Sequence, residues 1–227
     1  MLDVAIRKAD GTTAVDLGRR GAPPLPVAPA LADVLPNGLR RGSTVAVSGS
    51  MSLLLATLGA ASADGAWIAL VGFPRFSAES AAEYDLDLSR LAIIPTAGSG
   101  WTTAVGALLD ALDIVAARPP RLVPGDVRRL AARARTREAV LMPYGEWPGA
   151  DVRLSAAPGA WSGIGSGSGR LRARQVEVRA EGRGSAARPR TATLWLPASG
   201  GGVQPVTPER AVEPLAPMND PVIELAG

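Results

Sequence analysis

Short apolar runs alternate with helix-forming segments between residues 44 and 142, and this alternation restricts the fold more than any other feature. The run at 66–71 is apolar throughout, as in a strand that is buried on both faces of a sheet. Strands are expected at residues 44–47, 66–71, 91–94, 113–116 and 139–142, and helices at residues 51–61, 77–84, 102–112 and 125–137. Strands that alternate with helices in this way predict βαβ units and a mostly parallel sheet.

The pattern changes after residue 150, where strands follow one another without helices between them. These strands are expected at residues 152–156, 171–180 and 191–196. Polar and apolar residues alternate from Gln175 to Ala180, which is the period of a half-exposed strand. The Gly-rich connection at 181–187 predicts a long hairpin, and the Gly/Ser run at 163–169 predicts a mobile loop. The expected fold class is therefore α/β, with a mostly parallel central sheet extended by antiparallel C-terminal strands.

Residues 30–197 are expected to form one domain, whereas both ends of the chain are poorly patterned. Residues 1–29 include four prolines, which favour a partly extended N-terminal arm. Residues 198–227 form a tail rich in proline and glycine, with four acidic residues and one arginine. Three roles stay open for this acidic tail: it folds on a partner, it shields the more basic body, or it takes no part in function.

Histidine and cysteine are both absent from the 227 residues. Their absence excludes disulfides, thiolate or imidazole metal ligands, and nucleophile pairs of the Ser-His or Cys-His type. We therefore expect no metal site. The N-terminus has no apolar signal core, and the longest apolar run, at 53–61, is too short to span a bilayer. A cytoplasmic protein with no membrane partner is the expectation.

Three segments resemble parts of the RecA core in their order and spacing. Residues 31–50 resemble its first helical turn and first strand, residues 84–95 resemble the segment after its second strand, and residues 171–197 resemble its late antiparallel hairpin. The most specific piece is WPGADVRLSA, at 147–156, followed by WSGIGSGSGRLRARQVEV, at 161–178. These segments resemble the ImuA family, in the actinobacterial form that belongs to the DNA-damage-induced mutagenesis cassette. The resemblance implies a RecA-like core.

The phosphate loop of a RecA-type ATPase is degenerate in this sequence. Such a loop places four residues between two glycines and continues with a lysine for the outer phosphates and a Ser or Thr for magnesium. Here Gly49 is followed by Ser50, Met51 and Ser52, with no Gly-Lys pair. Met51 stands where the lysine would be, and Ser52 where the threonine would be. We expect this loop to be too short to surround a phosphate, and we expect no bound cofactor.

The other parts of the hydrolytic machinery are missing as well. A general-base carboxylate would follow the strand at 66–71, but residues 72–75 read Gly-Phe-Pro-Arg. A metal-binding Asp would end the strand at 113–116, but that strand runs into Arg118, and Asp113 opens it. Three separate losses predict a protein that is not an ATPase. A weak ATPase that uses the aberrant loop is the alternative, with the phosphates held by a helix N-terminus alone.

Arginines recur every fourth residue on the helix expected at 125–137. Arg129, Arg133 and Arg137 would form one stripe on the face opposite the apolar side chains. Such a stripe tracks DNA phosphates or docks an acidic partner, and the alternative is a solvated helix face. Trp147 lies in a turn between two glycines, where it is either an exposed interface residue or a packing anchor.

A second group of arginines lies on the strand expected at 171–180 and just before it. Arg170, Arg172 and Arg174 share one strand face through the two-residue period. They could line single-stranded DNA, with Trp161 as the stacking aromatic, or they form a protein interface or a soluble surface.

The function that follows from the ImuA resemblance is that of a non-catalytic accessory or scaffold in error-prone translesion DNA synthesis during the SOS response. The resemblance implies an ImuB-like inactive Y-family polymerase as partner and, through it, an error-prone replicative-type polymerase. The alternative is a modulator that binds single-stranded DNA or RecA filaments without ATPase activity. Self-association through the N-terminal arm also stays open.

Overall fold

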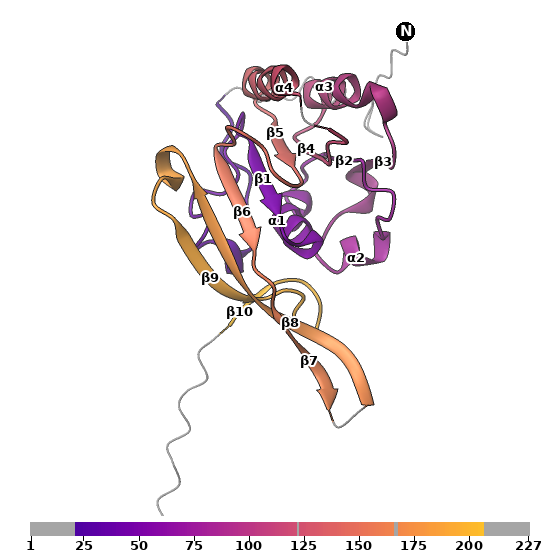
Figure 1. The fold of residues 1–227 in the computed structure, drawn as a ribbon, viewed down its shortest axis with the longest axis vertical. Coiled ribbons are helices and arrows are strands. Elements are labelled where there is room, and N and C mark those ends of the chain that lie inside the picture. The colour runs from indigo at the N-terminus through magenta and orange to yellow at the C-terminus, as the bar shows by residue number, and fades with distance from the viewer. Residues whose placement is uncertain (1–20, 122, 166–167, 207–227) are drawn as a thin grey trace, which may run out of the picture.

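The apolar runs of the first two thirds of the chain form a four-stranded parallel sheet (Figure 1). The computed structural model describes residues 21–121, 123–165 and 168–206. The strand order is β3-β2-β4-β5, with β2 at Ile68–Val71, β3 at Leu91–Ile94, β4 at Ile114–Ala117 and β5 at Val140–Pro143. All neighbours pair in parallel, so the carboxyl ends of these strands meet at one edge. The parallel sheet expected from the alternation is confirmed.

A second sheet contains β1 and the C-terminal strands, in the order β1-β6-β8-β9-β10 with β7 beside β8. The bounds are Val45–Ser48 for β1, Val152–Ala156 for β6, Ala160–Gly165 for β7, Ser168–Gly182 for β8, Arg190–Trp195 for β9 and Gln204–Pro205 for β10. Only β1 and β6 pair in parallel, and all later pairs are antiparallel. This is the antiparallel extension that the sequence predicts.

The two sheets meet where β1 lies beside β5. Isolated parallel bridges join Thr44 to Leu141 and Val47 to Tyr144. The amide of Leu141 donates to the Ser43 carbonyl at 3.0 Å, close to the first of these bridges. The strands therefore follow one another across both sheets, and β1 ends at the same edge as its parallel neighbours.

Helices cover both faces of the parallel sheet (Figure 1). Their bounds are Met51–Ala63 for α1, Ala78–Ala82 for α2, Trp101–Ala111 for α3 and Pro124–Arg137 for α4. Successive side chains of a strand point to opposite faces, so Leu70 packs with α1 in one apolar cluster and Ala69 packs with α3 and α4 in the other. None of the helices in the described ranges is long and apolar enough to cross a bilayer.

The expectation of a mobile loop at 163–169 is wrong. Strand β7 reaches Gly165 and β8 begins at Ser168, so the described residues of the Gly/Ser run lie in paired strands, and residues 166–167 lie outside the described residues. A backbone ladder needs no side chains, and Ile164 pairs with Gly169 across it. The resulting ribbon projects from the body of the molecule (Figure 1).

The described chain begins against the core and ends at the edge of the second sheet. The amide of Leu25 donates to the carbonyl of Leu39 at 2.9 Å, and the Leu25 side chain is buried. At the other end β10 pairs with β9. Residues 1–20 of the expected arm and 207–227 of the expected tail lie outside the described residues.

Candidate functional site at the carboxyl edge of the sheet

The turn between β1 and α1 lies where the sequence predicts a degenerate phosphate loop, and it is shorter than a phosphate cradle. Only Gly49 and Ser50 separate Ser48, the last residue of β1, from Met51, the first residue of α1. Gly49 has a φ of +83°, and a Cβ at this position would overlap the carbonyl oxygen of Ala156 at the end of β6. Two features require glycine at this position: the left-handed backbone conformation and the close approach of the Ala156 carbonyl. The end of β6 therefore closes the turn from one side.

An arginine from β8 occupies the N-terminus of α1. Ser50 is the N-cap residue and is 94 % buried, but its side chain makes no cap hydrogen bond. Instead, Nη2 of Arg174 donates to Oγ of Ser50 at 2.7 Å. Nε of the same guanidinium donates to the carbonyl of Leu196 at 3.1 Å, and its Cζ lies 5.4 Å from the ring centroid of Trp161. A helix N-terminus favours a negative charge, yet a cation stands at this one.

The ends of β2 and β4 carry an aromatic and cationic cluster where catalytic carboxylates would stand. Arg118 follows β4, and its guanidinium lies 5.8 Å from the ring centroid of Tyr144. Tyr144 packs edge-to-face on Phe73, which follows β2, with ring centroids 5.8 Å apart. Residues 72–75 and 118–121, the stretches after these two strands, contain no acidic residue. Across the described residues no three acidic side chains gather as a metal site would require.

Asp113 lies at the amino end of β4, as the sequence predicts. Its carboxylate accepts hydrogen bonds from Nη1 of Arg41 and from the amide of Trp67, both at 3.0 Å. The side chain of Arg41 is 17 % exposed and that of Asp113 is 10 % exposed, so this is a largely buried ion pair. Asp113 therefore has a structural role at the edge opposite the degenerate loop.

The three arginines of α4 lie on one side of the helix, as predicted, and each has an intramolecular partner. Both Nε and Nη2 of Arg133 donate to the carboxylate of Asp110 on α3, and Nε of Arg137 donates to the same carboxylate at 3.0 Å. Arg129 pairs with Asp126 one turn earlier, at 2.9 Å. The hydrogen bonds from Arg133 lower the pKa of the Asp110 carboxyl from its ordinary value, although burial opposes them. Two of the three arginines, Arg133 and Arg137, thus join α4 to α3.

The arginines on β8 differ in their surroundings and exposure. Arg174 turns toward Ser50. Arg172 is exposed and, together with Trp161 and Leu171, lines a hollow of about 770 Å³. Trp161 is 47 % exposed and Leu171 is 48 % exposed, which is unusual for large apolar side chains. Arg170 belongs to β8, but its side chain lies outside the described ones.

Of the two interpretations of Trp147, the structure supports the packing anchor and contradicts the exposed interface residue. Its side chain is 2 % exposed and belongs to the apolar cluster beneath α3 and α4. The turn that carries it folds onto the sheet, because the amide of Gly145 donates to the carbonyl of Val47 at 2.8 Å. A tryptophan between two glycines resembles a loop tip in sequence, and only the tertiary contact reveals its burial.

Sequence reasoning missed the contact between Arg174 and Ser50 and the packing of Tyr144 on Phe73. The first joins residues that are 124 positions apart, and no local pattern signals such a contact. The second had a weak signal, since each aromatic is the second residue after an expected strand, and the carboxyl ends of these strands meet at one edge.

Three comparisons relate the chain to known proteins, and one of them, with a solved structure, bears on the fold. The family described as the MT3502 N-terminal domain matches residues 33–149. The uncharacterized protein Rv3395c of Mycobacterium tuberculosis is 35 % identical over 130 residues, which are 55 % of this chain and 64 % of that relative. This chain therefore aligns with less than two thirds of the relative. The crystal structure of the RadB recombinase superposes with a TM-score of 0.56 at 15 % identity, over 79 % of this chain and 97 % of that chain. The expected RecA-like fold is confirmed.

Proposed function

We propose that this chain, which belongs to the MT3502 N-terminal domain family, is a RecA-like accessory protein that works through contacts with other macromolecules and not through nucleotide hydrolysis. The observation that carries the proposal is the two-residue turn at Gly49 and Ser50, which leaves no loop to surround a phosphate. The cation of Arg174 stands at the adjoining helix N-terminus, and Arg118 stands where a metal-binding carboxylate would be.

The proposed setting is error-prone translesion synthesis in the DNA-damage response, inside the cytoplasm. This part of the proposal rests on the resemblance of residues 147–178 to the ImuA family and on the RecA-like fold. The partners would be an ImuB-like inactive polymerase homologue and, through it, an error-prone replicative-type polymerase. A RecA-like body without its phosphate loop suits recruitment, because its sheet and helices still provide a rigid frame for interfaces.

The test of the non-catalytic part is a melting experiment with magnesium and ATP. A ligand that binds only the native state raises the melting temperature by mass action. We expect no change for this chain at millimolar nucleotide, while a RecA-fold ATPase with an intact phosphate loop, measured in parallel, is stabilised. A rise of several degrees for this chain would contradict the proposal.

The test of the scaffold part is co-purification of the full-length chain with ImuB-type and polymerase partners. Deletions of residues 1–20 and of 207–227 then locate the interface without removing Leu25, which is buried, or β10, which pairs with β9. We expect the ImuB-type partner to be retained by the full-length chain. If neither partner is retained, the scaffold assignment fails.

A second candidate function is binding of single-stranded DNA by the ribbon of β7 and β8. Trp161 offers an exposed ring to a base, and Arg172 and Arg174 place positive charge beside it. Fluorescence anisotropy with a labelled oligonucleotide tests it. An affinity tighter than about micromolar that falls with added salt favours this candidate. In that case Trp161→Ala reduces binding several-fold, whereas Arg128→Ala on the exposed side of α4 changes it little.

A further inference from the structure

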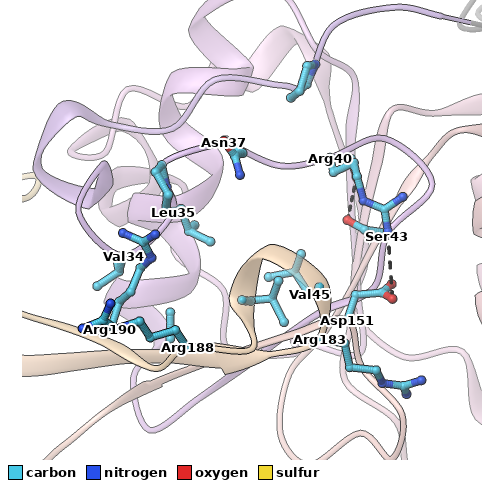
Figure 2. A pocket seen from close by; sticks show the side chains of 17 residues that line it. Val34, Leu35, Asn37, Arg40, Ser43, Val45, Asp151, Arg183, Arg188 and Arg190 are labelled. Carbon is cyan, nitrogen blue, oxygen red and sulfur yellow. Dashed lines mark hydrogen bonds and ion pairs between the residues drawn. The ribbon is translucent and has the colours of Figure 1, made fainter.

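A cavity of about 580 Å³ lies at the amino end of β1, on the edge of the molecule opposite the degenerate loop (Figure 2). The segment before β1 forms one wall, with Val34, Leu35 and Asn37. The other walls are formed by the start of β6, the end of β8 and the start of β9. Apolar side chains, including Val34, Leu35, Val45 and Val152, line its interior.

The charged side chains around this cavity are mostly arginines. The lining contains Arg40, Arg183, Arg188 and Arg190 against one carboxylate, Asp151. That carboxylate is already engaged, because Oδ2 accepts from the amide of Thr44 at 2.8 Å. Arg188 and Arg190 are exposed, and within the described residues neither side chain has a hydrogen-bond or ion-pair partner. An apolar interior with unpaired cations at its rim suits an acidic peptide that also has apolar side chains.

The described chain ends on a path that leads toward these cations. Strand β10 runs antiparallel to β9, with Gln204 opposite Trp195, and the amide of Val206 donates to the carbonyl of Thr193 at 3.1 Å. An extended chain advances about 3.3 Å per residue, so three further residues cover about 10 Å. If residues 207–209 continued in the register of β10, Glu209 would come opposite Arg190, where β9 begins at the rim of the cavity.

The chemistry of the remaining chain matches the cavity. Residues 207–227 contain four acidic residues against one arginine, and apolar residues lie between the acidic ones. We propose that this cavity is the docking site of the acidic segment 207–227 of the same chain. Arg188 and Arg190 pair with its carboxylates, and its apolar side chains enter the interior. A docked segment excludes other acidic peptides from the cavity, so its release would open a binding surface. The inference does not depend on the proposed function.

The absence of cysteine allows a direct test in the full-length chain. The pair Asn37→Cys and Ala211→Cys puts the only two thiols on the cavity wall and in the acidic segment. Mild oxidation should give an intramolecular disulfide, seen as faster migration on a non-reducing gel, and 1 M salt should reduce its yield. The control pair, Ala132→Cys and Ala211→Cys, has its first thiol on the exposed side of α4 and should form little. Equal yields for the two pairs, or none for either, overturn the proposal.

Charge reversal then tests which arginines hold the segment. Adding Arg188→Glu and Arg190→Glu to the Asn37 and Ala211 pair should lower the disulfide yield at least fivefold. Adding Arg128→Glu and Arg135→Glu, an equal charge change on α4, should leave the yield unchanged. Circular dichroism checks that both variants fold. Equal losses in the two variants, or a disulfide only between two chains, contradict docking of the segment on its own chain.

Discussion

Nη2 of Arg174 donates a 2.7 Å hydrogen bond to Oγ of Ser50, and this contact joins the middle of β8 to the N-terminus of α1. The same guanidinium bonds the carbonyl of Leu196 and stacks on Trp161. One side chain thus connects the antiparallel extension, the projecting ribbon and the degenerate loop. In an active RecA-type site the corresponding helix N-terminus receives phosphate, whereas here it contacts a guanidinium from a C-terminal strand.

The first prediction concerns this arginine. Arg174→Ala removes two charge-assisted hydrogen bonds and leaves the buried Ser50 hydroxyl without its donor, which should lower the free energy of unfolding by about 1–3 kcal/mol. Arg174→Lys keeps the charge but not the planar geometry of the guanidinium, so it should restore only part of the loss. Urea denaturation measures both. A free energy of unfolding within error of the wild-type value for the alanine variant would show that the contact contributes nothing.

The second prediction concerns the turn itself. Gly49→Ala places a Cβ against the Ala156 carbonyl at a backbone φ of +83°, and should destabilise the fold by more than about 3 kcal/mol. Gly98 provides the matched control, because its φ is +51° and no atom lies within 4 Å of a Cβ built there. Gly98→Ala should cost only about 1 kcal/mol of backbone strain. Thermal melting distinguishes the two, and equal losses would mean that β6 does not restrict the turn.

The third prediction is a pH dependence at the α3–α4 contact. Hydrogen bonds from Arg133 lower the pKa of Asp110 in the folded state. A lowered folded pKa contributes stability that is present above the unfolded pKa, about 3.9, and is lost as the pH falls through the folded value. Asp110→Asn should therefore destabilise the fold by about 1 kcal/mol at pH 7 and by clearly less near pH 2.5.

Denaturation at several pH values measures the Asp110 effect. Glu181→Gln is the control, since Glu181 pairs with Arg179 on β8 and the two side chains are 42 % and 53 % exposed. That variant should differ little from the wild type at any pH. A loss from Asp110→Asn that is the same at pH 7 and pH 2.5 would contradict an ionic origin.

The fold was largely predictable because its strands and helices have strong local periodicity. The strand at 152–156 has the predicted bounds, since its residues lie between a glycine turn and a proline. The helix expected at 77–84 forms only at Ala78–Ala82, because the chain enters a left-handed conformation at Asp85, with φ of 61°. Strand β7 was missed because Gly and Ser have no apolar period, and its pairing with β8 is a tertiary event.

The residues that the candidate site lacks could be predicted from the sequence, but the side chains that occupy it could be predicted much less. The missing lysine and carboxylates can be read from the residues after each expected strand. The positions of Arg174 and Arg133 cannot, because their partners, Ser50 and Asp110, are set by how the sheet and helices pack. A guanidinium on a long side chain can reach many partners. The periodicity of the sequence predicts only which face of a helix or strand carries the arginine.

The last prediction contrasts two tryptophans that look alike in sequence. Trp147 is 2 % exposed inside the cluster beneath α3 and α4, whereas Trp161 is 47 % exposed on the ribbon. Trp147→Ala removes a buried aromatic and leaves a cavity, so it should lower the free energy of unfolding by about 3–5 kcal/mol. Trp161→Ala loses mainly the contact with Arg174 and should cost no more than about 1 kcal/mol. Guanidinium denaturation measures both, and a loss from Trp161→Ala as large as that from Trp147→Ala would mean that the ribbon belongs to the core.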